Sequence, residues 1–384
     1  MTEAGGGPLT GLLVADFSRV LAGPYATMLL ADLGAEVVKV ESPQGDETRT
    51  WMPPTRDETS TYYLGINRGK RSIALDLRDE ADVAVAKELA RRADVLIENL
   101  RPGGMAKYGL DYASVAADNP GLVYASISGF GSTKGAHVPG YDLMVQAVSG
   151  LMSLTGDADG PPYRAGISIF DVMAGKDALI GILAALRHRD ATGRGQHVEL
   201  SLLASAMSGM VNQSSAYAAA GVVPTRMGNA HPSVVPYEPL PTADNPMVIA
   251  AANDGLFRKL VGVLGLPELA DDPRFLRNAD RTEHREELKP ILVEALSAKG
   301  AEEWFDLLVA AGVPCGPINS VAGGFAIAER FGLEPVVEVG EGDRAVPTTR
   351  HPIRFSDTPV TYELPPPERD EHGAELRKWL GSDA

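Results

Sequence analysis

The first half of the chain alternates short runs of β-branched residues with longer segments of helical periodicity, and this alternation constrains the fold more than any other feature. Strands separated by helices of this length are typical of a parallel sheet with helices on both faces. We therefore predict a doubly wound α/β domain with a parallel sheet. The expected strands are residues 12–17, 36–40, 72–75, 94–98, 122–128 and 197–200. The expected helices are 22–33, one starting near Asp79, 141–153, 171–189 and 202–219.

The composition and the periodicity of the sequence change after residue 220, and this change predicts the domain boundaries. Residues 221–246 contain six prolines and no clear period, which is typical of a linker. We predict a first domain at 1–220, a linker at 221–246 and a second, mainly helical domain at roughly 247–318. Helical segments are expected at 256–264, 285–296 and 301–311, and a last short helix at 374–380. Pro290 would either kink the middle segment or mark its start.

Charge and composition exclude several classes of partner. The formal net charge of −16 repels nucleic acid and anionic membrane, so we expect no binding to either. A single Cys315 excludes an internal disulfide and a thiolate-rich metal site. The first residues lack the pattern of a signal peptide, and the longest apolar run, residues 178–186, is too short to cross a bilayer. We expect a cytoplasmic protein.

Three familiar kinds of site are not supported. The loop after the first strand lacks the Gly-x-Gly-x-x-Gly pattern of dinucleotide-binding folds, and the isolated Gly129-Phe-Gly131 is typical of an ordinary turn. A nucleophile elbow at Ser168 would need a second glycine after the serine, which is missing. Seven scattered histidines without an His-x-x-x-His pair predict no metal site.

Asp171 begins the segment expected to be the longest helix, and two roles fit it. Aspartate is among the best helix N-caps, so a purely structural role is a sufficient local explanation. The same carboxylate follows the apolar residues Ile167, Ile169 and Phe170. Partial desolvation there would make it more nucleophilic, and a helix N-terminus would stabilise an oxyanion beside it. The residues alone leave both roles open.

Basic residues gather in the first hundred or so positions of an otherwise acidic chain. Most fall on expected loops or just after strands, at the edge where open α/β sheets bind ligands. Singly each is typical of a solvated rim, but together they fit a groove for a phosphorylated ligand. They are Arg19, Arg68, Lys70, Arg71, Arg78, Arg101 and Lys107.

Ten segments together resemble the class III CoA-transferases, the family of formyl-CoA:oxalate and carnitine CoA-transferases and of α-methylacyl-CoA racemase. Two examples are Leu-Gly-Ala-Glu-Val-Val-Lys-Val-Glu at 33–41 and Asp-Val-Leu-Ile-Glu-Asn-Leu-Arg-Pro-Gly at 94–103. The others are residues 8–17, 22–24, 67–76, 124–131, 181–186, 192–196, 228–232 and 312–319. Each is modest alone, but they run in order along nearly the whole chain.

The resemblance implies a fold and a site. The fold would be a large Rossmann-like domain built from both chain ends, with its first part at 1–220 and its return at 321–384, plus a smaller α+β domain at 247–320. The subunits would be ring-shaped and interlocked as a homodimer. Asp171 would be the catalytic aspartate, acting on an acyl-CoA and a small carboxylic acid without a metal. The CoA-binding residues would be Arg19, Ala22, Leu75, Arg78, Asn99, Leu100, Arg101, Lys107 and Tyr141.

The resemblance also separates two chemistries. In the transferase branch the aspartate forms a mixed anhydride and then an aspartyl-CoA thioester. The racemase branch needs a histidine base thirty residues earlier, where this chain has Tyr141, and a phenol with a pKa of about 10 is a poor base at neutral pH. His137 would need a loop shift to take that place. Leu21 stands where the formyl-CoA:oxalate branch has glutamine, which disfavours oxalate and formate and leaves dicarboxylic donors such as succinyl-CoA. We predict a CoA-transferase, with a racemase or epimerase as the alternative.

Overall fold

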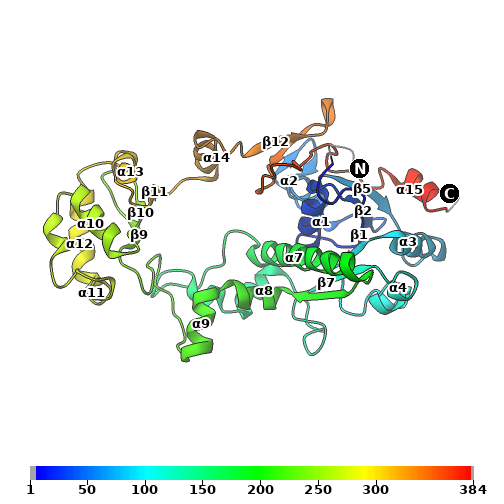
Figure 1. Cartoon of the computed structure of the whole chain (residues 1–384), viewed down its shortest axis with the longest axis horizontal. Coiled ribbons are helices and arrows are strands. Elements are labelled where there is room, and N and C mark those ends of the chain that lie inside the picture. Colours follow the sequence, from blue (N-terminus) through cyan, green and yellow to red (C-terminus); the bar gives the residue numbers. More distant parts are fainter. Residues whose placement is uncertain (1–5, 382–384) are drawn as a thin grey trace. The chain divides into compact units, whose positions relative to one another are not determined.

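The computed structural model describes residues 6–381, which form two compact units. The large unit comprises residues 6–151, 164–222 and 334–381, and its centre is a parallel sheet in the order β5-β2-β1-β6-β7-β8 (Figure 1). The strands are β1 Leu13–Asp16, β2 Glu36–Glu41, β5 Lys70–Ala74, β6 Val95–Glu98, β7 Val123–Ser128 and β8 His197–Ser201. The parallel α/β sheet predicted from the sequence is confirmed.

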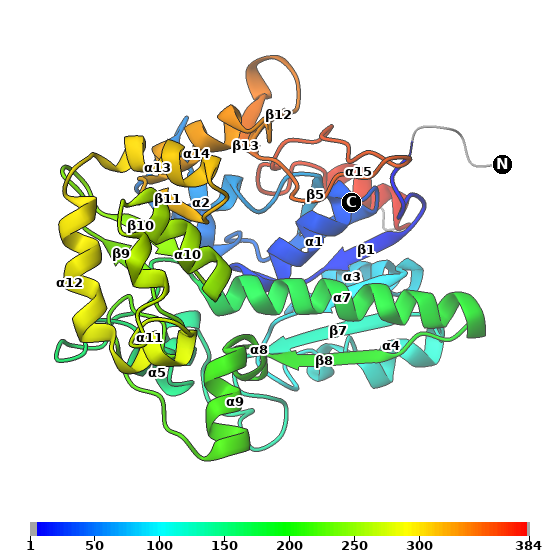
Figure 2. The same ribbon diagram turned by 60° about the vertical axis from the view of Figure 1, so that its left-hand side comes forward.

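Helices cover both faces of this sheet because alternate strand residues point to opposite sides. On one face, Val14 and Val37 pack with α1 Ala22–Asp32, α7 Ile169–Thr192 and α8 Leu202–Gly209. Figure 2 shows α7 running along the sheet past β7 and β8. On the other face, Ala15 and Val38 pack with α3 Glu80–Arg92, α4 Tyr112–Asp118 and the C-terminal α15 Gly373–Trp379. The chain end therefore returns to the large unit, where β12 Val336–Val339 and β13 Val346–Thr349 also lie.

Two predicted helices of the large unit are each divided. Residues 141–153 form α5 Asp142–Val148 and α6 Leu151–Leu154, separated at Gly150, whose φ of 96° is one that glycine adopts without strain. Residues 202–219 form α8 and α9 Val211–Ala220, separated at Met210. The remaining short elements here are β3 Thr55–Arg56, β4 Thr59–Ser60 and α2 Thr61–Leu64.

The small unit comprises residues 152–163 and 223–333, so its boundaries differ from the predicted ones. The predicted linker 221–246 contains β9 Tyr237–Leu240, which joins β10 Met247–Ala250 and β11 Cys315–Pro317 in an antiparallel sheet. β9 lies at an edge of this sheet, where a proline such as Pro239 costs no ladder hydrogen bond. The prolines of residues 221–246 therefore led to the prediction of a linker where the structure has the strand β9. The helices α10 Asp254–Val263, α11 Asn278–Glu283, α12 Arg285–Leu296, α13 Ala301–Ala310 and α14 Val321–Arg330 complete the unit, and α12 continues through Pro290.

Candidate active site

A cavity of about 240 Å³ lies at the carboxyl edge of the large sheet, where open α/β folds bind ligands. Its walls are the loops after β1, β6 and β7, the start of α5 and the first turn of α7. The cavity brings together seven of the ten site residues expected from sequence. These are Arg19, Ala22, Asn99, Leu100, Arg101, Tyr141 and Asp171.

A second cavity of about 650 Å³ adjoins it and shares Arg19 and Leu100. It is lined by the ends of β2 and β5 and includes Leu75 and Arg78, two more of the expected CoA-binding residues. Lys107 lines neither cavity; its ammonium lies 4.5 Å from the ring centre of Tyr108, which lines the second one. The nine expected CoA-binding residues therefore lie in or beside two connected hollows.

The first turn of α7 positions Asp171, but not as a helix cap. The N-cap residue is Ser168, and Asp171 is the third residue of the helix, so the capping role considered from sequence is wrong. The first-turn N–H groups are instead satisfied by Asp142 at the start of α5. Its Oδ1 accepts from the backbone N–H of Phe170 at 2.8 Å and of Asp171 at 3.3 Å. Because Asp142 takes over this task, the carboxylate of Asp171 is released to face the cavity.

Burial governs the charge of the Asp171 carboxylate. Desolvation, with the neighbouring Asp142 charge as the smaller cause, raises the pKa of Asp171 to about 7. No lysine or arginine among residues 6–381 forms an ion pair with it. A carboxylate without a counter-charge in a partly closed site is poorly solvated and has the properties of a nucleophile.

Sequence reasoning missed three residues around Asp171. Asp142 is the cap just described, and Gln146 donates to Asp142 and to the carbonyl oxygen of Ile167. Burial, followed by the charge of Asp171, raises the pKa of the Tyr62 phenol to about 12, and the Trp51 ring packs edge-on against it at 5.1 Å. A phenol with this pKa stays protonated, and it is hydrogen-bonded to the side chain of Ser168, the N-cap residue of α7. No local pattern marks these residues, since their roles arise only from contacts made at long range.

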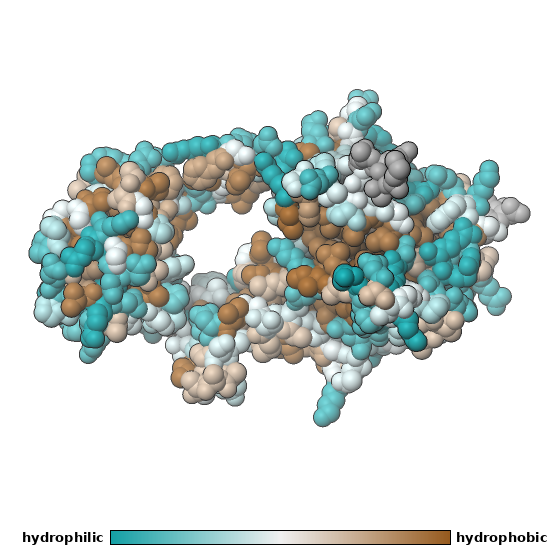
Figure 3. Space-filling view, in the orientation of Figure 1, coloured by the Kyte–Doolittle hydropathy of each residue, from teal (hydrophilic) through white to brown (hydrophobic). Residues whose placement is uncertain are grey.

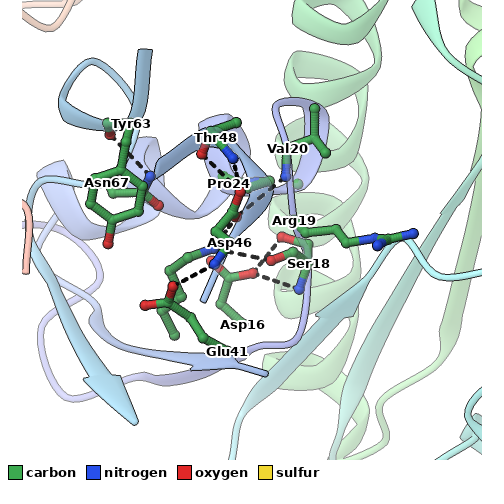
Figure 4. A network of polar contacts seen from close by, with 12 residues as sticks. Asp16, Ser18, Arg19, Val20, Pro24, Glu41, Asp46, Thr48, Tyr63 and Asn67 are labelled. Atoms are coloured by element: carbon green, nitrogen blue, oxygen red, sulfur yellow. Dashed lines mark hydrogen bonds and ion pairs between the residues drawn. The ribbon is translucent and has the colours of Figure 1, made fainter. Parts of the chain in front are cut away.

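A buried network of charges fixes the loop after β1 (Figure 4). Lys39 donates to Asp46 at 2.9 Å and to the carbonyl oxygen of Ser18 at 3.2 Å. Asp46 also accepts from the backbone N–H of Val20 at 3.3 Å, and Val20 holds an unusual φ of 68°. On the cavity side, the Asn99 side-chain amide accepts from the backbone N–H of Arg19 at 2.9 Å and donates to its carbonyl oxygen at 2.7 Å. The turn that carries Arg19 is therefore held from both sides.

The basic residues that the sequence grouped together have different environments in the structure. Arg68 and Lys70 are buried and paired with Asp32 and Asp16, so their assignment to an anion groove is wrong. Arg71 is paired with Glu36 and Glu375, away from both cavities. Arg19, Arg78 and Arg101 line the cavities, although Arg19 is paired with Glu47 and Arg78 with Asp76. A phosphorylated ligand would have to compete with these two carboxylates.

The model of one family matches residues 9–373, and its description is CoA-transferase family III. The chain belongs to this family. It is 42% identical to the succinate–glutarate CoA-transferase of Agrobacterium fabrum, over 96% of this chain and 94% of that protein. It is 43% identical to the acetyl-CoA:oxalate CoA-transferase of Acetobacter aceti, over 97% and 95%. A CAIB/BAIF family protein from Brucella suis has the same fold, with a TM-score of 0.86 and 42% identity over 98% of this chain and 100% of that one.

As a family III CoA-transferase, the protein acts on CoA thioesters, and the resemblance predicted from sequence is confirmed. Within residues 6–381, no group of three or more His, Cys, Asp or Glu side chains is arranged to hold a metal ion. No helix of this part of the chain is long and apolar enough to cross a bilayer.

Proposed function

We propose that this CoA-transferase moves coenzyme A from a dicarboxylic acyl-CoA, such as succinyl-CoA, to a free carboxylic acid, with Asp171 as the nucleophile. The observation that carries the proposal is the half-buried carboxylate of Asp171, without a counter-charge, in a cavity between the loops that also hold Arg19, Asn99 and Tyr141. Several relatives with dicarboxylic substrates in their names support the donor class, among them the succinyl-CoA:glutarate CoA-transferase of mouse at 40% identity.

The proposed reaction consists of four exchanges at Asp171. Its carboxylate attacks the donor carbonyl carbon, the C–S bond breaks, and CoA thiolate leaves a mixed anhydride behind. The thiolate attacks the aspartyl carbonyl of the anhydride and expels the donor acid, which gives an aspartyl-CoA thioester. The acceptor carboxylate attacks this thioester and forms a second anhydride with release of thiolate. The thiolate then attacks the acyl carbon, so that the new acyl-CoA leaves and Asp171 is restored.

Exclusion of water is necessary for this route, because both anhydrides hydrolyse readily. Within the large unit, the protonated Tyr62, with the Trp51 ring packed against it, acts on Asp171 from one side, and the first turn of α7 holds the carboxylate in place. The adjoining larger cavity, with Leu75 and Arg78 at its wall, is our proposed site for the nucleotide part of CoA.

A panel of acids tests the reaction and its substrates together. The protein is incubated with succinyl-CoA and, separately, with glutarate, oxalate, acetate and mesaconate, and new acyl-CoA is identified by mass. We expect transfer to the longer dicarboxylic acids glutarate or mesaconate and little to oxalate, since Leu21 lines the cavity where the formyl-CoA:oxalate branch of the family carries glutamine. Absence of transfer with every donor and acceptor would contradict the function, whereas efficient transfer to oxalate would contradict only the substrate class.

The pH dependence of the first exchange follows from the pKa of Asp171. Only the ionised carboxylate attacks, so below a pKa of about 7 the single-turnover rate should fall about tenfold per pH unit, and above it the rate should level off. Asp142→Asn keeps the oxygen that accepts the N–H groups of α7 but removes its charge, and should move the midpoint to lower pH. A flat profile from pH 5.5 to 8.5, or an unmoved midpoint in Asp142→Asn, would contradict this account.

Racemisation of a 2-methylacyl-CoA is the second candidate, because His137 lines the same cavity as Asp171 and Tyr141. A racemase needs two bases on opposite sides of the α-carbon. The test is incubation of 2-methylacyl-CoA in deuterium oxide without an acceptor acid, followed by mass analysis of the α-carbon. We expect no deuterium at the α-carbon beyond the protein-free rate. Incorporation that is lost in His137→Gln but retained in the exposed His188→Gln would favour the racemase instead.

We also propose that the protein is a homodimer. Large apolar side chains are exposed on α5, α7 and α9, and Ile180 and Val211 are 64% and 66% exposed. On the face shown in Figure 3, apolar residues gather over α7 and the adjoining α8. Extended apolar surface of this kind is typical of a subunit interface. Sedimentation equilibrium should give twice the mass of one chain, and Ile180→Glu should shift the protein toward monomer.

A further inference from the structure

A third cavity, of about 280 Å³, lies on the opposite face of the large sheet from α7, and the proposed reaction does not use it. Three neighbouring strands supply its polar wall: Glu98 on β6 is in register with Ser126 on β7, and His197 follows on β8. Ser126 Oγ lies 2.9 Å from His197 Nε2. Tyr112 and Tyr124 form the aromatic wall.

Glu98 differs from the other buried carboxylates in having no cationic partner. Five of them are paired with lysine or arginine, namely Asp16, Asp32, Glu41, Asp46 and Glu238. A sixth, Asp142, lies at the N-terminus of α7 and accepts its N–H groups. Glu98 is only 8% exposed, yet within the described chain it has only the N–H of Leu100, at 2.7 Å, and the Ser126 hydroxyl as partners. A buried carboxylate without a counter-charge is costly to keep, and this one lines an open cavity.

The rest of the cavity provides negative charge and aromatic faces, not the missing cation. Glu199 and Asp111 also line it, on β8 and before α4. His197 stacks on Tyr112 with 5.0 Å between ring centres, and burial lowers its pKa, so it is neutral at physiological pH. Tyr124 meets both rings edge-on. Carboxylates and tyrosine faces around one hollow are the features that recognise an organic cation.

We propose that this cavity binds a protonated primary alkylamine, with the ammonium group at Glu98 and its carbon chain against the wall that Tyr112 and Tyr124 form. A metal ion is disfavoured, because the described residues hold no cluster of three suitable ligands. An ammonium group needs only one carboxylate and nearby oxygen acceptors, which Glu98 and Ser126 supply. Two tyrosine rings match an alkyl chain better than a hydrated metal ion.

The amine site is coupled to the groove proposed for CoA. Leu100, Pro102, Ile127 and Ser128 line both this cavity and the one that contains Asp171. An ammonium at Glu98 favours the ionised carboxylate, which is a stronger acceptor for the N–H of Leu100. Occupation of the site would therefore stiffen the turn Asn99–Arg101. The effect on CoA binding rests on the proposed function, whereas amine binding itself does not.

Calorimetric titration with butylammonium chloride tests the proposal, with n-butanol as the neutral molecule of the same shape. At pH 8.5 we expect saturable binding of butylammonium and none of butanol. Burial raises the pKa of Glu98 to about 7, so affinity should fall about tenfold per pH unit below 7, as protons compete with the amine. Equal binding of butanol, or no binding of butylammonium, would overturn the proposal.

Matched variants locate the site. Glu98→Gln keeps the shape and an oxygen for the Leu100 N–H, and should weaken butylammonium binding at least tenfold. Asp118→Asn removes the same charge from the exposed side of α4 and should bind like the unchanged protein. Should Glu98→Gln fail to fold, Tyr112→Leu is expected to weaken binding about threefold to tenfold instead. Unchanged binding in both variants would overturn the site.

Two further binding experiments distinguish this site from the catalytic site and from a contact between subunits. Asp171→Asn should bind butylammonium normally, so loss of activity and loss of the amine site are distinguishable. A lysine of a second copy would satisfy the same chemistry. If butylammonium binds only after dilution has dissociated the oligomer, the cavity belongs to that contact and the small-amine proposal is overturned.

Discussion

Asp171→Asn is expected to lower the rate of CoA exchange by about 10⁴-fold or more, the order of loss observed when a covalent nucleophile is removed. Asparagine keeps the size of the side chain and its place in the first turn of α7, but a neutral amide does not attack a thioester. Because Asp142 satisfies the N–H groups of that turn, the substitution should leave the helix intact. The measurement is the initial rate of acyl-CoA formation, with thermal unfolding recorded in parallel.

Asp190→Asn is the matched control for this substitution. Asp190 lies on the same helix, is exposed near its C-terminal end and lines none of the cavities described above, so its removal should change the rate less than twofold. Hydroxylamine added during turnover should leave a hydroxamate on Asp171 in the unchanged protein and none in Asp171→Asn. Transfer at the normal rate by Asp171→Asn would remove Asp171 from the mechanism.

Asp171 also shows what local sequence reasoning can and cannot supply. The start of a long helix near this residue was predictable from periodicity, and aspartate there suggested a cap. The carboxylate that accepts the first N–H groups of this helix belongs to Asp142, on another helix 29 residues earlier, where only the fold brings it close. The proposed catalytic role of Asp171 depends on Asp142 accepting these N–H groups in its place. The family resemblance, and not the helix pattern, was what pointed to the nucleophile.

The strand pattern was predictable because buried parallel strands are apolar and short, and each was located to within about two residues. The partners of charged residues were not. Lys70 was expected ahead of the strand at 72–75, as part of an anion groove, but its ammonium lies 3.1 Å from Asp16, on a strand that is separated from its own by β2. Whether such a lysine faces solvent or another charge depends on the order of strands in the sheet, which composition and spacing do not encode.

The ion pair of Arg68 was not predictable for the same reason, because only the fold brings its partner close. It pairs through two hydrogen bonds, of 2.8 and 2.6 Å, with Asp32 at the end of α1. A sequence shows an arginine beside a glycine turn, which resembles a phosphate-binding loop. The complementary acid becomes visible only when α1 and the loop before β5 are packed together. Fold class therefore follows from periodicity, whereas the separation of structural from functional charges requires coordinates.

Lys39→Met is expected to lower the free energy of unfolding by about 3–5 kcal/mol, the usual cost of removing one partner from a buried ion pair. Lys39 and Asp46 are each 1% exposed at their side chains, and Asp16 and Glu41 act on the same ammonium. Methionine fills the space but leaves the Asp46 carboxylate buried without its counter-charge. Denaturant unfolding followed by circular dichroism gives the change.

Two variants distinguish the contribution of the Lys39 charge to stability from the contribution of its packing. Lys39→Met combined with Asp46→Asn removes both charges and should recover part of the lost stability, since no uncompensated carboxylate remains. Lys87→Met, on the exposed side of α3, should change stability by less than about 0.5 kcal/mol. Because Lys39 and Asp46 also hold Ser18 and Val20, the single variant should raise the KM for acyl-CoA at temperatures where it is still folded. An unchanged unfolding midpoint would show that this network does not stabilise the turn that carries Arg19.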